Sequence, residues 1–157
     1  MQNHSELLEE IGSMLLDSKL FDHLSPVELR AAAQYFSINQ ITEDETIFSE
    51  GDPGNFMCIV HSGKISVLKA NQNGEQVIVA SLSHGRAFGE MAVLDGERRS
   101  ATCLAAEDSI LLALSKDALD AMLDEHPRIG ADVIRAIAVS LSRRLRMAVG
   151  QLVDHLV

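Results

Sequence analysis

The stretch FGEMAVLDGERRSAT, residues 88–102, places a glycine, one glutamate and two adjacent arginines between two predicted strands. A short helix that begins at Glu90 or Met91 would leave its first backbone N–H groups without helical partners, which favours an anion. Arg99 supplies a balancing charge, and its planar fork matches two oxygens of a phosphate. Glu90 would repel that phosphate unless it faces a donor such as a sugar hydroxyl. Sugar and phosphate together indicate a nucleotide.

The spacing of these residues leaves a second interpretation open. A buried carboxylate and a buried guanidinium can satisfy each other in a salt bridge that holds no ligand. A glycine–glutamate pair followed by an arginine is a weak signal by itself. The spacing alone favours the ligand site and the salt bridge equally.

On both sides of this stretch, residues 37–115 form short apolar or β-branched runs separated by turn residues. Seven or eight such runs are typical of an antiparallel sandwich or barrel. Asn73-Gly74 is the strongest hairpin signal among the separators. The region from 37 to 115 is therefore predicted to be the β part of the molecule.

Helical patterns flank this β region. Residues 5–36 are helical by pattern, and Ser25, Pro26 and Glu28 form a capping box that starts a helix running to about Phe36. Ser115 caps a predicted helix over 116–125, and Pro127 precedes a final helix over 128–155, about 40 Å long. The apolar stripe of that helix fits either an intramolecular core or a helix-to-helix dimer. Its arginines are predicted to be solvated: Arg128, Arg135, Arg143, Arg144 and Arg146.

The bulk composition limits the class of protein. A chain of 157 residues with 46% hydrophobic residues is predicted to form one domain, 1–157. The formal net charge of −10 opposes binding to nucleic acid or to an anionic membrane by this chain alone. The acidic start lacks a secretory signal, so a cytoplasmic location is predicted. Cys58 and Cys103 are predicted to be reduced core thiols.

Read as a whole, residues 88–102 resemble the phosphate-binding cassette of the cyclic nucleotide-binding domain family. The family pattern is F-G-E, an apolar residue, A, two apolar positions, a variable turn, and R-[ST/A]-A-T, and this chain matches it without a gap. A second signature of that family, in the early barrel strands, resembles IFSEGDPGNFMCIVHSG at residues 47–63. The resemblance extends from about Leu20 to the end of the chain.

This resemblance implies a mainly β fold, an eight-stranded antiparallel β-roll with N-terminal helices and two C-terminal helices. It implies that Arg99 pairs the cyclic phosphate, that Glu90 accepts from the ribose 2′-OH, and that backbone N–H groups of Ala92 and Ser100 complete the cradle. Gly89 permits close approach of the backbone. The expected ligand is cAMP, with cGMP as the alternative, and no cofactor or metal is expected. The implied ligand-binding set is Phe88, Gly89, Glu90, Met91, Ala92, Arg99, Ser100 and Ala101.

Two positions differ from the usual family pattern. Cys103 replaces an aliphatic residue in a strand, and Arg98 stands beside Arg99 as a second cation. Adjacent residues of a strand point to opposite faces, so Arg98 is predicted to be solvated while Arg99 enters the site.

The resemblance implies a non-catalytic sensor. Ligand binding would tighten the cassette and move the final helix about a hinge near Pro127, and that helix would contact a protein partner or a second copy. Three alternatives stay open beside it. The chain could be the sensor part of a catabolite-activator-type regulator, truncated before or lacking its helix-turn-helix. It could be a ligand-free interaction module. It could also be a β-barrel enzyme, although its six histidines show no pair at metal-ligand spacing and no catalytic motif is visible.

Overall fold

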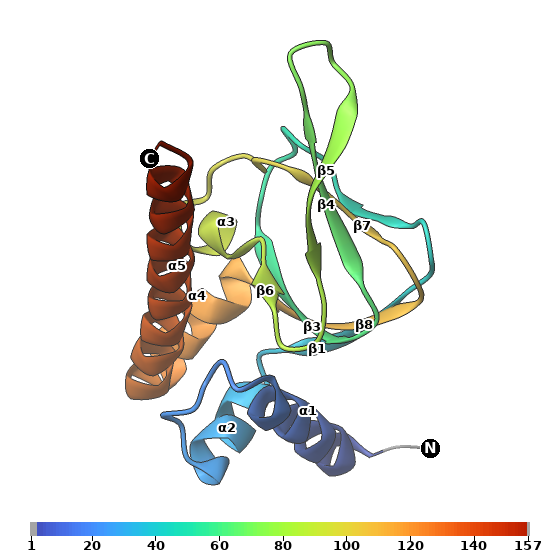
Figure 1. Cartoon of the computed structure of the whole chain (residues 1–157). Coiled ribbons are helices and arrows are strands. Elements are labelled where there is room, and N and C mark those ends of the chain that lie inside the picture. Colours follow the sequence, from blue (N-terminus) through green and yellow to red (C-terminus); the bar gives the residue numbers. More distant parts are fainter. Residues whose placement is uncertain (1–2, 157) are drawn as a thin grey trace.

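The computed structural model describes residues 3–156, with side chains described as far as residue 153. Eight antiparallel strands form two four-stranded sheets, in the orders β1-β8-β3-β6 and β2-β7-β4-β5. The predicted eight-stranded β-roll is confirmed, and Figure 1 shows helices packed at one side and at the base of this roll. The strands are β1 (Ser37–Ile41), β2 (Thr46–Phe48), β3 (Phe56–Ser62), β4 (Ile65–Ala70), β5 (Gln76–Leu82), β6 (Ala87–Phe88), β7 (Thr102–Ala105) and β8 (Ser109–Ser115).

The N-terminal helices are α1 (His4–Ser18) and α2 (Pro26–Ala33). The predicted capping box is present: Ser25 Oγ accepts from Glu28 N at 3.2 Å, and Glu28 Oε1 accepts from Ser25 N at 3.0 Å. The helix ends at Ala33, before the predicted end at Phe36, because the chain there turns towards β1. Both helices place their buried leucines against the roll.

The C-terminal helices are α4 (Lys116–Glu125) and α5 (Pro127–Leu156), close to their predicted bounds. Ser115 Oγ caps α4 by accepting from Ala118 N at 3.0 Å. The first half of α5 buries Val133, Ala136 and Ile137. The second half extends past α3 (Glu90–Asp95), which places it beside the segment that carries the family signature (Figure 1).

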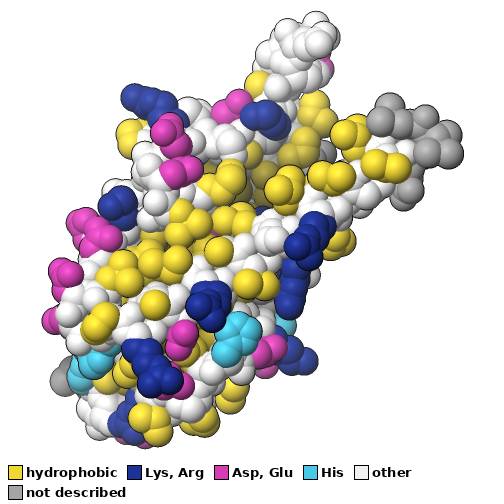
Figure 2. Space-filling view, turned by 90° about the vertical axis from the view of Figure 1, so that its left-hand side faces the viewer, with side chains coloured by type: hydrophobic (Ala, Val, Ile, Leu, Met, Phe, Trp, Pro, Cys, Tyr) yellow, Lys and Arg dark blue, Asp and Glu magenta, His cyan; other side chains and the backbone are white. Residues whose placement is uncertain are grey.

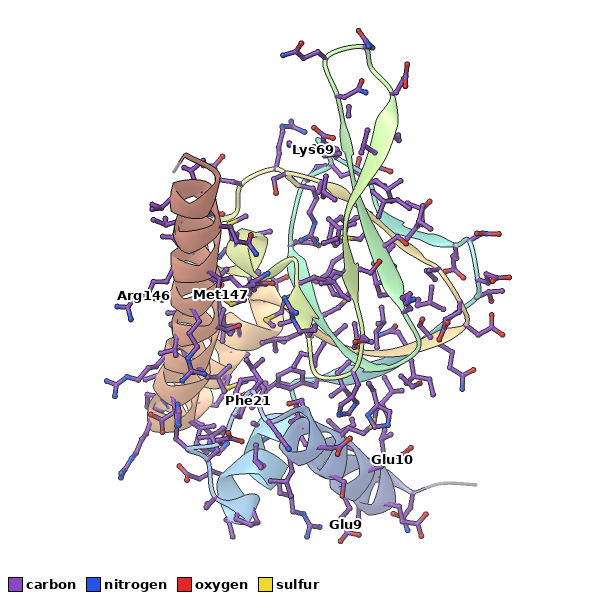
Figure 3. The ribbon with its side chains drawn as sticks, viewed as in Figure 1. Glu9, Glu10, Phe21, Lys69, Arg146 and Met147 are labelled. Carbon is purple, nitrogen blue, oxygen red and sulfur yellow. The ribbon has the colours of Figure 1, made fainter. Side chains whose placement is uncertain are left out.

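Two hydrophobic clusters hold these layers together. One joins α1, α2, α4 and α5 to the sheet β1-β8-β3-β6 through residues such as Leu15, Met57 and Leu114. Phe21 belongs to this cluster and lies where the N-terminal helices meet the rest of the molecule (Figure 3). The second cluster fills the inside of the roll between the sheets and includes Cys58 and Cys103. Both cysteines are free and buried, as predicted.

The hairpin of β4 and β5 projects from the roll (Figure 1). Its connection, residues 71–75, contains Gly74 at φ +80°. Asn71 Oδ1 accepts from the backbone N–H groups of Asn73 and Glu75. The predicted hairpin is therefore confirmed.

Among the described residues, no helix is both long enough and apolar enough to cross a membrane.

Candidate functional site

The cassette begins with an abrupt change from strand to helix. Strand β6 ends at Phe88, Gly89 adopts φ +75°, and α3 starts at Glu90. A Cβ atom at Gly89 would lie 2.7 Å from Arg99 Nη1, so glycine is required both for the backbone conformation and for the space. Gly96 ends α3 with φ +72°, and its N–H donates to Ala92 O at 2.8 Å.

The two family signatures pack against each other. The N–H of Gly51 donates to Arg99 O at 2.8 Å, and the N–H of Arg99 donates to Asp52 O at 2.8 Å. A Cβ at Gly54 would lie 2.4 Å from the Cβ of Ala92, so the loop before β3 contacts α3 closely. The loop containing Gly51 and Gly54 therefore fixes the backbone of the cassette.

Arg99 is buried and held in one orientation. Its Nη1 donates to Gly89 O at 3.1 Å, and its Nη2 donates to Phe56 O at 2.7 Å. Its guanidinium carbon lies 3.9 Å from the ring centre of Phe48 and 4.6 Å from that of Phe56, within range of cation–π attraction. Burial lowers the pKa of Arg99, but a guanidinium stays charged at neutral pH. Arg99 Nε is buried and has no hydrogen-bond partner among the described residues.

Glu90 is only 3% exposed and forms an ion pair with Arg144 of α5. Arg144 lies in the second half of that helix, so this pair attaches the helix to the cassette. The prediction that Arg144 is solvated was wrong, because its side chain turns inward to the carboxylate. Glu90 Oε1 makes the ion pair, whereas Oε2 is buried and has no hydrogen-bond partner among the described residues. The salt bridge left open by the sequence thus exists, but its cation comes from α5, and one carboxylate oxygen stays unused.

These groups line a cavity of about 630 Å³ between the roll, α3 and α5. That size suits a small organic ligand. All eight residues predicted to bind ligand lie on its wall: Phe88, Gly89, Glu90, Met91, Ala92, Arg99, Ser100 and Ala101. Figure 2 shows α5 in front, with hydrophobic side chains gathered around a hollow beside it.

Arg98 is exposed, as predicted, and donates to Gly51 O at 2.9 Å. Arg99 is buried, although both arginines are among the residues that line the cavity. The two arginines do not differ through the predicted alternation of a strand, because residues 96–101 are not in a strand and β7 begins at Thr102. The loop of residues 49–54 binds the side chain of Arg98 and the backbone of Arg99. The carbonyls of Gly89 and Phe56 hold the side chain of Arg99.

Sequence reasoning missed several residues of the cavity wall. Phe48, Val67 and Leu82 form apolar wall from strands distant in the sequence, and Leu141, Arg144 and Leu145 contribute from α5. The helical spacing of Leu141, Arg144 and Leu145 on one face was a signal, because an arginine inside an apolar stripe needs an anion. Burial lowers the pKa of Arg144, and the charge of Arg86, which also lines the cavity, lowers it further.

In chemical terms, the cavity combines apolar walls, one fixed buried cation and one buried carboxylate with a free oxygen. A cation with an unused N–H and a carboxylate with an unused lone pair suit a ligand with both an anionic group and a hydroxyl. Fold and site together define a small-ligand-binding β-roll. The chain belongs to the cyclic nucleotide-binding domain family, whose model matches residues 38–126.

Similar proteins agree with this assignment. The chain is 36% identical over 131 residues to the cyclic AMP receptor protein of Thermus thermophilus. This match covers 83% of this chain and 59% of that protein. It is 33% identical over 106 residues to a cAMP-dependent protein kinase regulatory subunit of Mycosarcoma maydis, covering 68% of this chain and 20% of that subunit. A solved cyclic nucleotide-binding domain from Methylobacillus flagellatus KT superposes with a TM-score of 0.83 at 29% identity, covering 96% of this chain and 85% of that one.

The chain therefore spans 59% of the length of the Thermus relative and a fifth of the kinase subunit. The rest of each of these longer proteins lies outside the matched region. The likeness supports the binding module and its cavity.

Proposed function

We propose that this protein is a non-catalytic sensor that binds a cyclic nucleotide, cAMP in preference to cGMP. The observation that carries the proposal is the pair of unused polar atoms in the cavity, Arg99 Nε and Glu90 Oε2. Buried polar atoms without partners are costly, so a ligand that satisfies both gains binding free energy. The similarity to the cyclic AMP receptor protein of Thermus thermophilus supports cAMP as the preferred ligand.

Each residue has a proposed role. Arg99 donates to the cyclic phosphate through Nε and the N–H groups that the carbonyls of Gly89 and Phe56 leave free. Glu90 Oε2 accepts from the ribose 2′-OH. The backbone N–H groups of Ala92 and Ser100 complete the phosphate cradle, and the apolar walls cover the rest of the nucleotide.

The proposed signal passes through Glu90 to α5. One carboxylate faces the ligand with Oε2 and Arg144 with Oε1, so ligand binding and helix docking share one side chain. A ligand shifts the position of α5 only if it binds the docked arrangement more tightly than the undocked one. The stretch at His126 and Pro127, between α4 and α5, is the proposed hinge.

The proposed partner surface is the exposed apolar face on the second half of α5. Its members are Leu145, Val149, Leu152 and Val153. Figure 2 shows hydrophobic side chains along this end of the helix. A second copy of the chain, or a protein partner, would cover them. We expect neither nucleic acid nor membrane binding by this chain alone, and the cytoplasmic location remains a prediction.

The test is isothermal titration of nucleotide-stripped protein with cAMP, followed by competition with cGMP and 5′-AMP. We expect stoichiometric cAMP binding that 5′-AMP does not displace. Arg99→Ala should weaken binding by about 2 kcal/mol or more, roughly thirtyfold, because a charge-assisted pair with the phosphate is lost. The matched control is Arg146→Ala, because Arg146 points away from the roll (Figure 3). An Arg99→Ala variant that is folded and binds cAMP like the wild type would refute the assignment of the site.

A further inference from the structure

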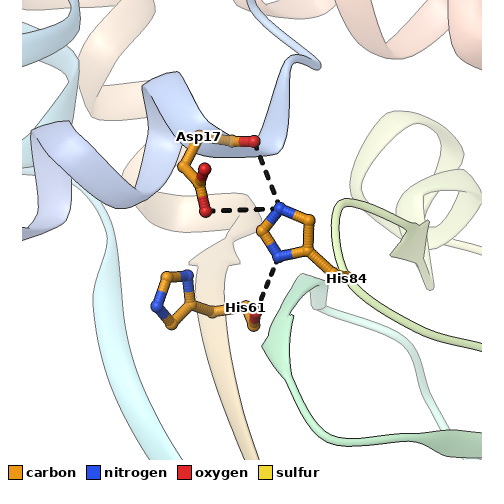
Figure 4. Close-up of side chains that lie close together, drawn as sticks. All are labelled: Asp17, His61 and His84. Atoms are coloured by element: carbon orange, nitrogen blue, oxygen red, sulfur yellow. Dashed lines mark hydrogen bonds and ion pairs between the residues drawn. The ribbon is translucent and has the colours of Figure 1, made fainter.

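Three side chains of types that can bind metal ions come from distant parts of the chain and meet near the turn before β6. Asp17 is near the end of α1, His61 is in β3, and His84 is in the turn between β5 and β6. Their ligand atoms lie within 4.8 Å of one another (Figure 4). The histidine spacing in the sequence gave no sign of a ligand pair, because His61 and His84 are 23 residues apart. The fold supplies the proximity that the spacing lacks.

The orientation of His84 is that of a metal ligand with its supporting hydrogen bond. Nδ1 lies 2.8 Å from the carbonyl of His61, which leaves Nε2 facing Asp17, 3.2 Å from Oδ2. Metal-bound histidines usually donate their other ring N–H to such a carbonyl, which fixes the tautomer. Two ligand atoms bound at about 2.0–2.1 Å in a tetrahedral site are a little over 3 Å apart, as Nε2 and Oδ2 are here.

His61 provides an independent sign of a missing partner. Its Nδ1 is buried and accepts or donates no hydrogen bond among the residues that the structure describes. The ring of His61 lies 6.0 Å from that of His84, centre to centre. A buried ring nitrogen beside a carboxylate and a second imidazole is a position that a cation would satisfy.

The turn that carries His84 is fixed, so the three ligands are already arranged. Gly85 N–H donates to Val60 O at 2.8 Å, and Val60 N–H donates to Arg86 O at 2.9 Å. A Cβ at Gly85, whose φ is +83°, would lie 3.1 Å from the carbonyl oxygen of Ser18. The turn thus packs directly on the end of α1, where Asp17 lies.

We propose that Asp17, His61 and His84 bind a divalent transition-metal ion of the zinc class. Two imidazole nitrogens and one carboxylate oxygen suit zinc, whereas magnesium and calcium prefer oxygen ligands alone. The side chains of Asp17 and His84 are 57% and 49% exposed, so an ion can enter and keep water in its remaining position. Bound there, the ion would join α1 to β3 and to the β5–β6 turn.

The experiment is a titration of the tag-free, chelator-treated full chain with zinc chloride, with magnesium chloride in a parallel series. We expect one zinc ion for each chain, a rise in Tm with zinc, and no response to magnesium, since an ion that binds only the folded state stabilises it. His84→Gln and His61→Gln should each weaken zinc binding at least about tenfold. His126→Gln is the matched control, because His126 packs on Tyr35 away from the cluster.

Asp17→Asn provides a variant that should stay folded, because the side chain is exposed at a helix end. It should lose zinc affinity by a similar factor without losing structure by circular dichroism. Two outcomes would overturn the proposal. One is the absence of zinc binding by the wild type. The other is binding that the variants at residues 17, 61 and 84 retain, since zinc would then bind elsewhere on the chain.

Discussion

The Glu90–Arg144 ion pair should be measurable as a coupling free energy between α3 and α5. Glu90 is 3% exposed and the side chain of Arg144 is 35% exposed, so the pair is shielded on one side and partly open on the other. Two unit charges about 4 Å apart at the effective dielectric constant near a protein surface interact by about 4 kcal/mol. Partial exposure and the cost of desolvation reduce this, and we expect a coupling of about 1–3 kcal/mol.

The assay is a double-mutant cycle on the free energy of unfolding in urea. Arg144→Ala and Glu90→Gln should each destabilise the protein by about 2 kcal/mol, because each leaves a buried group without its partner. The double variant should cost little more than either single one. Circular dichroism is the suitable signal, since the chain has no tryptophan.

Arg143→Ala is the matched control for the cycle, because Arg143 is the neighbouring arginine and is exposed. It should change stability by less than about 0.5 kcal/mol. A coupling below about 0.5 kcal/mol would refute the ion pair and with it the proposed route from Glu90 to α5. If the pair docks α5 for ligand binding, Arg144→Ala should also weaken cAMP binding by about fivefold or more.

Three further predictions follow from the described contacts. Gly89→Ala should lower the free energy of unfolding and cAMP affinity more than Gly51→Ala, measured by urea unfolding and titration. Both residues have positive φ, but a Cβ would meet Arg99 only at position 89. Burial raises the pKa of Cys58 and of Cys103 to about 12, so neither native thiol should react with a thiol reagent at pH 8, and both should react in urea. The His61 carbonyl and then Asp17 raise the pKa of His84, against smaller opposing effects of desolvation and of Lys19. In chelator, the stability advantage of wild type over His84→Gln should therefore be full below about pH 6.5 and fall as pH rises through the raised pKa; an advantage that is constant from pH 5.5 to 8.5 would contradict this.

Local patterns predicted the parts of the structure that local physics determines. The capping box at Ser25 and the Ser115 cap depend on residues three apart, so the helix starts were readable from the sequence. The cassette is also local, since Gly89, the six residues of α3 and Gly96 are contiguous. That is why the predicted wall residues between Phe88 and Ala101 all line the cavity.

The missed features depend on residues that are far apart in the chain. Arg144 looked like one of several solvated arginines, and only the path of α5 past α3 brings it to Glu90. Phe48 and Phe56 hold Arg99 by their rings, but nothing in their local sequence specifies that contact. Asp17, His61 and His84 meet for the same reason. Long-range pairing of this kind is set by packing, which a periodic pattern does not encode.

The segment of residues 83–90 links the two attachment points of the helices to the roll. It begins at the turn of His84, which contacts α1, and continues through Arg86, which lines the cavity and lowers the pKa of Arg144. It ends at Glu90, which is paired to α5. Strand β6 between them has only two residues, so a displacement of the turn at His84 would also move Glu90. Because coupling between sites is reciprocal, an ion held at His84 and a nucleotide held at Glu90 would each change the affinity for the other if the segment has two arrangements.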